Sequence, residues 1–229
     1  STLTKENWTT LQSKNINFNA DVNLQNTGII GISRDIDDSA YTGNINGNNH
    51  TLTLSIGETY GCKEENIATN GREGCGKIYS SGSKHTDIGL FSCMSGDVSN
   101  LTIAGSIKAA VSSGNMGIGS IAARQKTNET VISNVQVTTA ITFDAKGDSQ
   151  ISCIGGLFGS TEKVKLNGNT CIQSNITLSN AGSGKQTYAG SVAGYMSAGT
   201  LECNDVTIGG TIVTDASMYA YVGGLVGFM

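Results

Sequence analysis

The sequence predicts an all-β protein, a right-handed parallel β-helix (a solenoid) of about five to six coils with a short N-terminal capping helix. Three observations predict it. A glycine-aliphatic motif recurs at spacings of 31 to 36 residues, which is the signature of a repeat architecture. A strand-like alternation of apolar and polar residues follows the first four copies. The chain of 229 residues contains 31 Gly and no Pro, a composition that suits many tight turns between strands whose backbone N–H groups are all needed.

The first repeated element is a short corner motif centred on one aliphatic residue. Its five copies follow one another at spacings of 31, 36, 35 and 33 residues, and we expect their central residues to form an inward-facing column: Leu90, Ile121, Leu157, Val192 and Leu225. The flanking glycines should permit positive φ at the corners and a close approach of the next coil. We therefore expect Gly156→Val and Gly224→Val both to be costly.

The second repeated element is a strand with one buried face. Pairs such as Leu101/Ile103 and Val135/Val137 alternate with polar residues, which is the period of a half-buried strand. We expect a second inward column formed by Leu101, Val135, Ile176 and Val206. Strands this short, with no helical pattern between them, fit coils stacked about 4.8 Å apart rather than alternating strands and helices.

The chain reads as a single β-helix domain with three parts. Residues 1–57 form an N-terminal cap and lead-in coil, in which Leu3, Trp8 and Leu11 predict a short amphipathic helix that covers the open end. Residues 58–84 form a polar inserted loop, and residues 85–229 hold the repeats. Because the sequence stops directly after a fifth corner motif, we expect further repeats or another domain to continue it.

The six cysteines form no CxxC pair of the kind that binds zinc. Cys62 and Cys75 bracket the polar insertion, and a disulfide between them would contribute about 3 kcal/mol in the chain-entropy model. Cys171 and Cys203 are one repeat apart and are candidates for a second disulfide. The alternative is that they are thiols that act as small hydrophobes. Either disulfide would imply an oxidising compartment.

Several of these motifs resemble a known family. The corner motif is clearest in Gly156-Leu157-Phe158-Gly159 and Gly224-Leu225-Val226-Gly227, and residues 20–24 and 41–52 look like the lead-in strand and turn that precede it. The chain is similar here to the GLUG-repeat family of mostly bacterial surface proteins. Residues 120–123 lack the glycines of that family, and the insertion interrupts its pattern. The resemblance implies a secreted or surface-anchored, adhesin-like β-helix and carries over no catalytic residue.

Charge and hydropathy exclude two classes of partner. The net charge is −4 and the 14 basic residues are scattered, so no basic stripe is available for nucleic acid. No apolar run reaches the roughly 18 to 20 residues of a spanning helix, so direct membrane insertion is not expected. The expected partners are an unidentified host or matrix protein, a glycan, or a second copy docked end to end.

The sequence offers few candidates for chemistry. Residues 117–122 match GxGxxA, but they coincide with a corner motif and lack the strands and helices of a dinucleotide site. Asp37 and Asp38 could hold Ca²⁺ or act on a glycan, although a solvated loop is the favoured interpretation. His50 should make a structural hydrogen bond, and His85 should lie in the inserted loop or at its edge. Neither histidine has triad partners at a recognisable spacing.

Tyr188 and Tyr221 align with Cys153 just before three successive corners. We expect them to form a small structural stack rather than a sugar-binding ladder, and we expect no catalytic residue, cofactor or metal. The sequence therefore favours a non-enzymatic extracellular or cell-surface segment, adhesin-like or scaffolding, with the insertion as its specificity element. The alternatives are a glycan-binding or glycan-cleaving β-helix and a structural subunit of an extracellular filament or appendage. Ice binding is not expected, because the outward positions vary between repeats.

Overall fold

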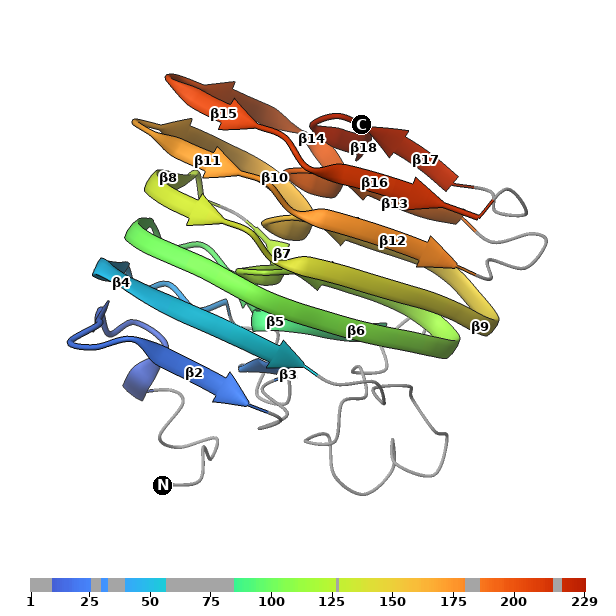
Figure 1. Ribbon diagram of the computed structural model, residues 1–229, viewed down its shortest axis with the longest axis horizontal. Helices are drawn as coiled ribbons and strands as arrows, with labels where there is room; N and C mark the ends of the chain where they lie inside the picture. Colours follow the sequence, from blue (N-terminus) through green and yellow to red (C-terminus); the bar gives the residue numbers. More distant parts are fainter. Residues whose placement is uncertain are drawn as a thin grey trace.

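The chain winds into stacked coils in the computed structural model, and each strand lies beside a strand of a neighbouring coil (Figure 1). The structure describes residues 10–25, 30–32, 40–56, 85–126, 128–179, 186–215 and 220–229. Within these ranges the strand pairs are parallel, for example β4 with β6, β6 with β9 and β10 with β14. The predicted all-β parallel solenoid is thereby confirmed.

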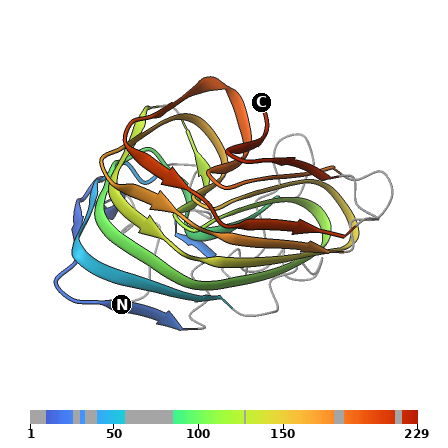
Figure 2. The same cartoon turned by 45° about the horizontal axis from the view of Figure 1, so that its top comes forward.

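The strands of the described part run along the coils, and the longer ones bend where the coil turns (Figure 2). Their bounds are β1 Ile16–Asn17, β2 Val22–Gln25, β3 Ile30–Ile32, β4 Ile45–Ile56, β5 His85–Met94, β6 Val98–Gly119, β7 Ala122–Gln125, β8 Thr130–Val137, β9 Ala140–Gly155, β10 Phe158–Asn167, β11 Thr170–Ile172, β12 Asn175–Ser179, β13 Gln186–Gly190, β14 Ala193–Cys203, β15 Val206–Ile208, β16 Thr211–Thr214, β17 Ala220–Gly223 and β18 Val226–Phe228.

Aliphatic columns along the stack form the core. One column, read from the strand register, consists of Val22, Leu52, Ile103, Val137, Ile172 and Ile208. Its four inner members are buried, whereas the first and the last are only partly buried because a coil covers them on one side. Alternation with polar neighbours places these residues on one face of each strand. Each buried aliphatic side chain contributes about 1.5 to 3 kcal/mol to folding.

The residues predicted for the first inward column occupy equivalent positions in successive coils. Backbone hydrogen bonds link successive members of the column. The Ile121 N–H donates to the Leu157 carbonyl at 3.0 Å, the Leu157 N–H donates to the Val192 carbonyl at 3.1 Å, and the Val192 N–H donates to the Leu225 carbonyl at 2.9 Å. Leu90, Ile121, Leu157 and Val192 are buried. Leu225 is 43% exposed, because no coil in the described part lies above it.

The second predicted column needs one correction. Leu101 pairs with Val135, and Val206 pairs with Thr170. Thr170 lies above Val135, whose N–H donates to the threonine hydroxyl at 3.4 Å. The place expected for Ile176 is therefore filled by Thr170, a fully buried residue whose hydroxyl donates to the Asn167 carbonyl at 2.6 Å. Satisfying its hydroxyl locally lets threonine fill an apolar column.

Ile176 belongs to the neighbouring column. It pairs with Ile141 on one side and with Ile212 on the other, and Ile107 continues the column through Ile141. Sequence reasoning misplaced Ile176 because it aligned β12 with the second strand of the other repeats, whereas β11 holds that position and β12 follows it.

The corner glycines act through close approach and not through positive φ. A Cβ on Gly156 would lie 2.2 Å from the Ser191 carbonyl oxygen, so the next coil leaves no room for a side chain. A Cβ on Gly224 would meet nothing within 4 Å. The described part of the structure therefore gives a steric reason for a cost of Gly156→Val but none for a cost of Gly224→Val. Neither glycine has a positive φ.

Positive φ occurs instead at a second corner, where asparagine predominates. Asn100, Asn134, Asn169 and Asp205 have φ of +52°, +53°, +49° and +55°, a region that asparagine and aspartate tolerate better than other residues with a side chain. The Asn134 amide donates to Asn100 Oδ1 at 2.8 Å, and Asn100 donates to Asn46 Oδ1 at 3.2 Å. These side chains form an asparagine ladder that runs along the stack.

Two predictions at the N-terminal side concern residues that are wholly or largely undescribed. The insertion with Cys62 and Cys75 lies outside the described residues, as do residues 1–9 of the expected capping helix. Thr10 and Leu11 are the described helical residues, and Leu11 is 44% exposed. The described part therefore gives no support to a helix that covers the core. It also contains no helix long and apolar enough to cross a membrane.

Candidate functional site

Two columns of side chains flank the corner motifs and contribute the polar and aromatic contacts around them. The column before the corner consists of Asp87, Gly117, Cys153, Tyr188 and Tyr221. The column after the corner consists of Cys93, Arg124, Ser160, Tyr195 and Phe228. Both columns are charged or polar near the N-terminal coils and aromatic at the C-terminal end.

A buried ion pair occupies the N-terminal part of these columns. Arg124 Nη2 lies 2.9 Å from Asp87 Oδ2, and Arg124 Nε donates to the same oxygen at 3.1 Å. The two side chains are 9% and 3% exposed. Asp87 lies on β5, before the corner at Leu90, and Arg124 lies on β7, after the corner at Ile121. The pair therefore joins two successive coils. Charges this deeply buried are tolerated only when they are paired.

Cys153 lies between the ion pair and the aromatic rings. Burial, with a smaller contribution from the negative charge of Asp87, raises the pKa of the Cys153 thiol to about 12. The thiolate is the reactive form of cysteine. Cys153 is therefore an unreactive thiol at neutral pH, which makes it unsuited to nucleophilic catalysis.

The C-terminal part of the columns is a cluster of four aromatic rings: Tyr188, Tyr195, Tyr221 and Phe228. The centroid of Phe228 lies 4.9 Å from that of Tyr188, 5.9 Å from Tyr195 and 5.6 Å from Tyr221. Tyr188 is also 5.3 Å from Tyr221 and 5.8 Å from Tyr195. These separations are typical of favourable aromatic pairs.

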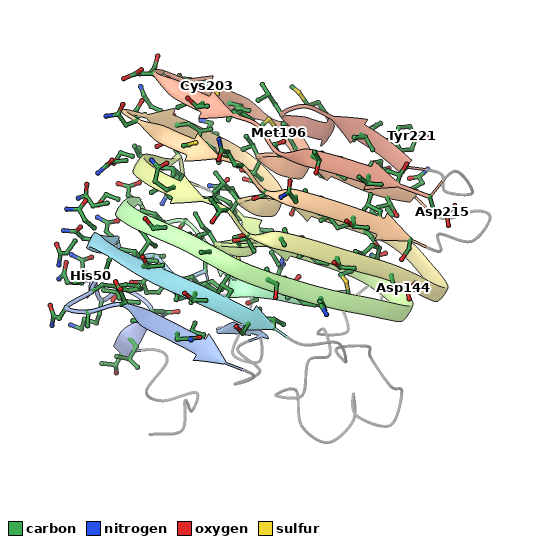
Figure 3. All side chains as sticks on the ribbon, in the orientation of Figure 1. His50, Asp144, Met196, Cys203, Asp215 and Tyr221 are labelled. Atoms are coloured by element: carbon green, nitrogen blue, oxygen red, sulfur yellow. The ribbon has the colours of Figure 1, made fainter. Side chains whose placement is uncertain are left out.

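The aromatic cluster is buried on one side and open on the other. Tyr188 is 7% exposed, its hydroxyl donates to Gln186 Oε1 at 2.5 Å, and burial raises its pKa. Tyr221 and Phe228 are 44% and 41% exposed. Tyr221 lies at the C-terminal end of the stack (Figure 3). The cluster therefore presents rings to the outside at one end of the molecule.

Sequence reasoning found half of this arrangement. Tyr188 and Tyr221 lie in register with Cys153, as the alignment of the repeats predicts. Tyr195 and Phe228 were missed. The signal was present, because each lies three residues after the central aliphatic residue of its corner motif. Arg124 occupies the same position in an earlier coil, so this one position supplies the basic member of the ion pair and two of the rings.

The remaining candidate residues do not converge on a site. His50 lies on β4, where its Nδ1 is 3.4 Å from Asp21 Oδ1, and the same carboxylate oxygen accepts the Thr51 N–H at 2.8 Å. This pairing links two coils at an exposed position (Figure 3). Asp37, Asp38 and the side chain of His85 lie outside the described part of the molecule.

Residues 117–122 form the end of β6, a corner and the start of β7. A Cβ on Gly119 would lie 2.3 Å from the Ala122 carbonyl oxygen and 2.4 Å from the Leu157 carbonyl oxygen. The glycine is needed for backbone packing, which accounts for the match to a dinucleotide fingerprint.

Cys171 and Cys203 are both thiols and are not bridged. Cys171 pairs with Thr207 of the next coil, whereas Cys203 pairs with Leu166. The two cysteines therefore lie on opposite sides of the asparagine corner, and being one repeat apart in sequence does not place them in one column. The prediction of a second disulfide is wrong for this reason.

No group of three or more metal-ligating side chains is found among the residues that the structure describes. Comparison of the chain with protein-family models, with curated proteins and with solved structures gave no match. The candidate site therefore consists of the two columns that flank the corner motifs.

Proposed function

We propose that the chain is a non-enzymatic extracellular scaffold segment, adhesin-like in architecture and of the GLUG-repeat type. In this proposal the solenoid is right-handed, has five to six coils, and carries an N-terminal helical cap. The observation that supports it is the continuity of the stack: aliphatic columns, corner backbone bonds and the asparagine ladder all run from coil to coil. Such contacts stabilise each coil through its neighbours, as a scaffold requires.

Specificity in this proposal belongs to the insertion at residues 58–84, because solenoids carry binding residues on loops that interrupt the repeat. The test is an array of glycans and extracellular-matrix proteins, probed with the whole chain. A second sample has residues 60–83 replaced by a Gly-Ser segment of equal length, which keeps the connection between β4 and β5. A signal that is lost with the replacement supports the proposal, whereas a signal that is retained refutes the assignment to the insertion.

Two observations favour alternative functions. The exposed rings of Tyr221 and Phe228 favour a glycan-binding β-helix, because sugar faces stack on aromatic rings. The same array tests this alternative: binding that survives the loop replacement but is lost in Tyr221→Ala would support it. A glycan-cleaving activity would instead depend on Asp37 or Asp38 and would be lost on Asp→Asn substitution there.

The parallel pairing of successive coils favours a filament subunit, because the same pairing between copies of the chain would build a filament. Electron microscopy of the purified chain tests this alternative. Filaments that lengthen with concentration would support it.

A further inference from the structure

Three hydroxyl groups are buried in the interior of the stack without a hydrogen-bond partner. Their oxygens are Ser120 Oγ, Thr139 Oγ1 and Ser174 Oγ, and none of them has a partner among the residues that the structure describes. All three residues are 0% exposed. Burying a hydroxyl without a hydrogen bond is unfavourable, and buried polar groups are almost always paired with protein or with ordered water. The three hydroxyls therefore indicate a small polar ligand in the interior.

Thr139 and Ser174 are the middle members of one column. The Asn175 N–H donates to the Thr139 carbonyl at 3.3 Å, and the strand register places Ser174 directly above Thr139. Glycines continue the column on both sides, with Gly105 below Thr139 and Gly210 above Ser174. A Cβ on Gly105 or Gly210 would lie 2.0 or 2.2 Å from a carbonyl oxygen of the coil below. Hydroxyl groups in this column are therefore confined to two adjacent coils.

The corner motif faces this column across the interior. A Cβ on Gly156 would lie 2.8 Å from Ser174 Oγ, so the serine hydroxyl is directed at the corner. Ser120 is the equivalent of Gly156 one coil below, and its N–H donates to the Gly156 carbonyl at 3.3 Å. The register of both columns thus places Ser120 opposite Thr139, as Gly156 lies opposite Ser174. The three hydroxyls converge on one region between the corner and the column that faces it.

The spacing of the coils in this region suits a water molecule. Equivalent positions of adjacent coils are about 4.8 Å apart, which is too far for a direct O–H···O bond of about 2.7 to 2.8 Å. Two such bonds that meet at a tetrahedral oxygen span about 4.6 Å. A buried water typically makes about three hydrogen bonds, and three hydroxyls converge here. A bound Ca²⁺ would instead need about six or more oxygen ligands, carboxylates among them.

We infer that the interior of the stack binds one ordered water molecule, held by the hydroxyls of Ser120, Thr139 and Ser174. The water satisfies the three buried hydroxyls, and it joins two successive coils through their side chains. It also links the corner motif to the column on the other side of the interior, where the backbone ladders do not reach. This site does not depend on whether the solenoid serves as a scaffold or binds a glycan.

The first test is urea unfolding of the whole chain with two matched variants. Thr139→Val keeps the shape of the buried side chain and removes its hydroxyl. Thr142→Val makes the same change at an exposed residue of β9. We expect the ratio of folded to unfolded chains to fall about fivefold or more in Thr139→Val, because the water loses a partner. Thr142→Val should leave this ratio within about twofold of the parent. An unchanged or higher ratio in Thr139→Val would mean that its hydroxyl has no partner to lose, which would overturn the inference.

The second test is a crystal structure of the whole chain. We expect electron density for one water within hydrogen-bond distance of both Thr139 Oγ1 and Ser174 Oγ. A direct bond between two of the hydroxyls, or a site without such density, would overturn the inference even where Thr139→Val is destabilised. If Thr139→Val does not fold, the crystal structure of the parent decides alone.

Discussion

Removing one partner of the buried Asp87–Arg124 ion pair should destabilise the fold by several kcal/mol. The Nη2–Oδ2 distance of 2.9 Å gives an attraction of about 6 kcal/mol at an effective dielectric constant of about 20. The loss of solvation on burial offsets much of that attraction in the intact pair. When only one partner is removed, the attraction is lost while the remaining charge stays buried. We therefore expect Arg124→Met or Asp87→Asn to cost about 3 to 5 kcal/mol.

The assay is urea unfolding followed by circular dichroism. The double variant Asp87→Leu/Arg124→Met buries no charge, so it should be more stable than Arg124→Met by at least about 1 kcal/mol. Lys165→Met is the control, because its ion pair with Glu202 at 3.0 Å is exposed and should contribute little to stability. The reasoning is refuted if Arg124→Met costs no more than Lys165→Met, or if the double variant loses the sum of the two single losses.

Three further variants or labelling experiments test other parts of the structure. Asn134→Ala should cost about 1 to 2 kcal/mol, because it loses a ladder bond and places alanine at positive φ; Asn134→Gly should cost less in the same thermal-melting assay. Gly156→Val should cost about 3 kcal/mol or more, whereas Gly224→Val should change stability by less than about 0.5 kcal/mol, and equal losses would contradict the close-approach explanation. Because burial raises the pKa of Cys153 to about 12, iodoacetamide at about pH 8 should label the exposed Cys203 first in the folded chain. Equal labelling rates before unfolding would show that Cys153 is accessible.

The sequence predicts the stack well where one residue type recurs at one position. The corner column of Leu157, Val192 and their equivalents could be found because burial between coils demands an aliphatic residue there. Ile176 was misplaced because two neighbouring columns are both aliphatic, and periodicity alone cannot separate them. Spacing could have done so, since 34 residues separate Leu101 from Val135 but 41 separate Val135 from Ile176.

The corner contacts were harder to predict for a physical reason. Asp87 and Arg124 are 37 residues apart, more than one repeat, so nothing local indicates that they meet. Tyr195 and Phe228 stand where earlier coils carry Ser160 and Arg124. A position that changes from charged to aromatic along the stack gives no repeating signal, although the backbone geometry is the same in each coil.

Gln125 shows how the coils keep register although the repeats differ in length. Its side-chain Oε1 accepts hydrogen bonds from the Thr161 hydroxyl at 2.7 Å and from the N–H groups of Glu162 and Lys163 at 3.0 and 3.1 Å. Ser160 and Val164 of β10 pair with Arg124 and Thr130 of the coil below, so five residues (125–129) of that coil lie opposite three residues (161–163) of β10. The Gln125 side-chain oxygen thus accepts the hydrogen bonds of two N–H groups that would otherwise pair with backbone carbonyls of the coil below.

The coil above β10 lengthens at the same place. Thr161 pairs with Met196 and Lys163 with Thr200, so three residues there lie opposite Glu162 alone. Insertions and deletions at this point of the coil change the length of the chain without moving the columns on either side. The coils therefore differ by whole residues at this point, as they also do between Asn46 and His50 and between Val111 and Met116, while the aliphatic columns stay in alignment.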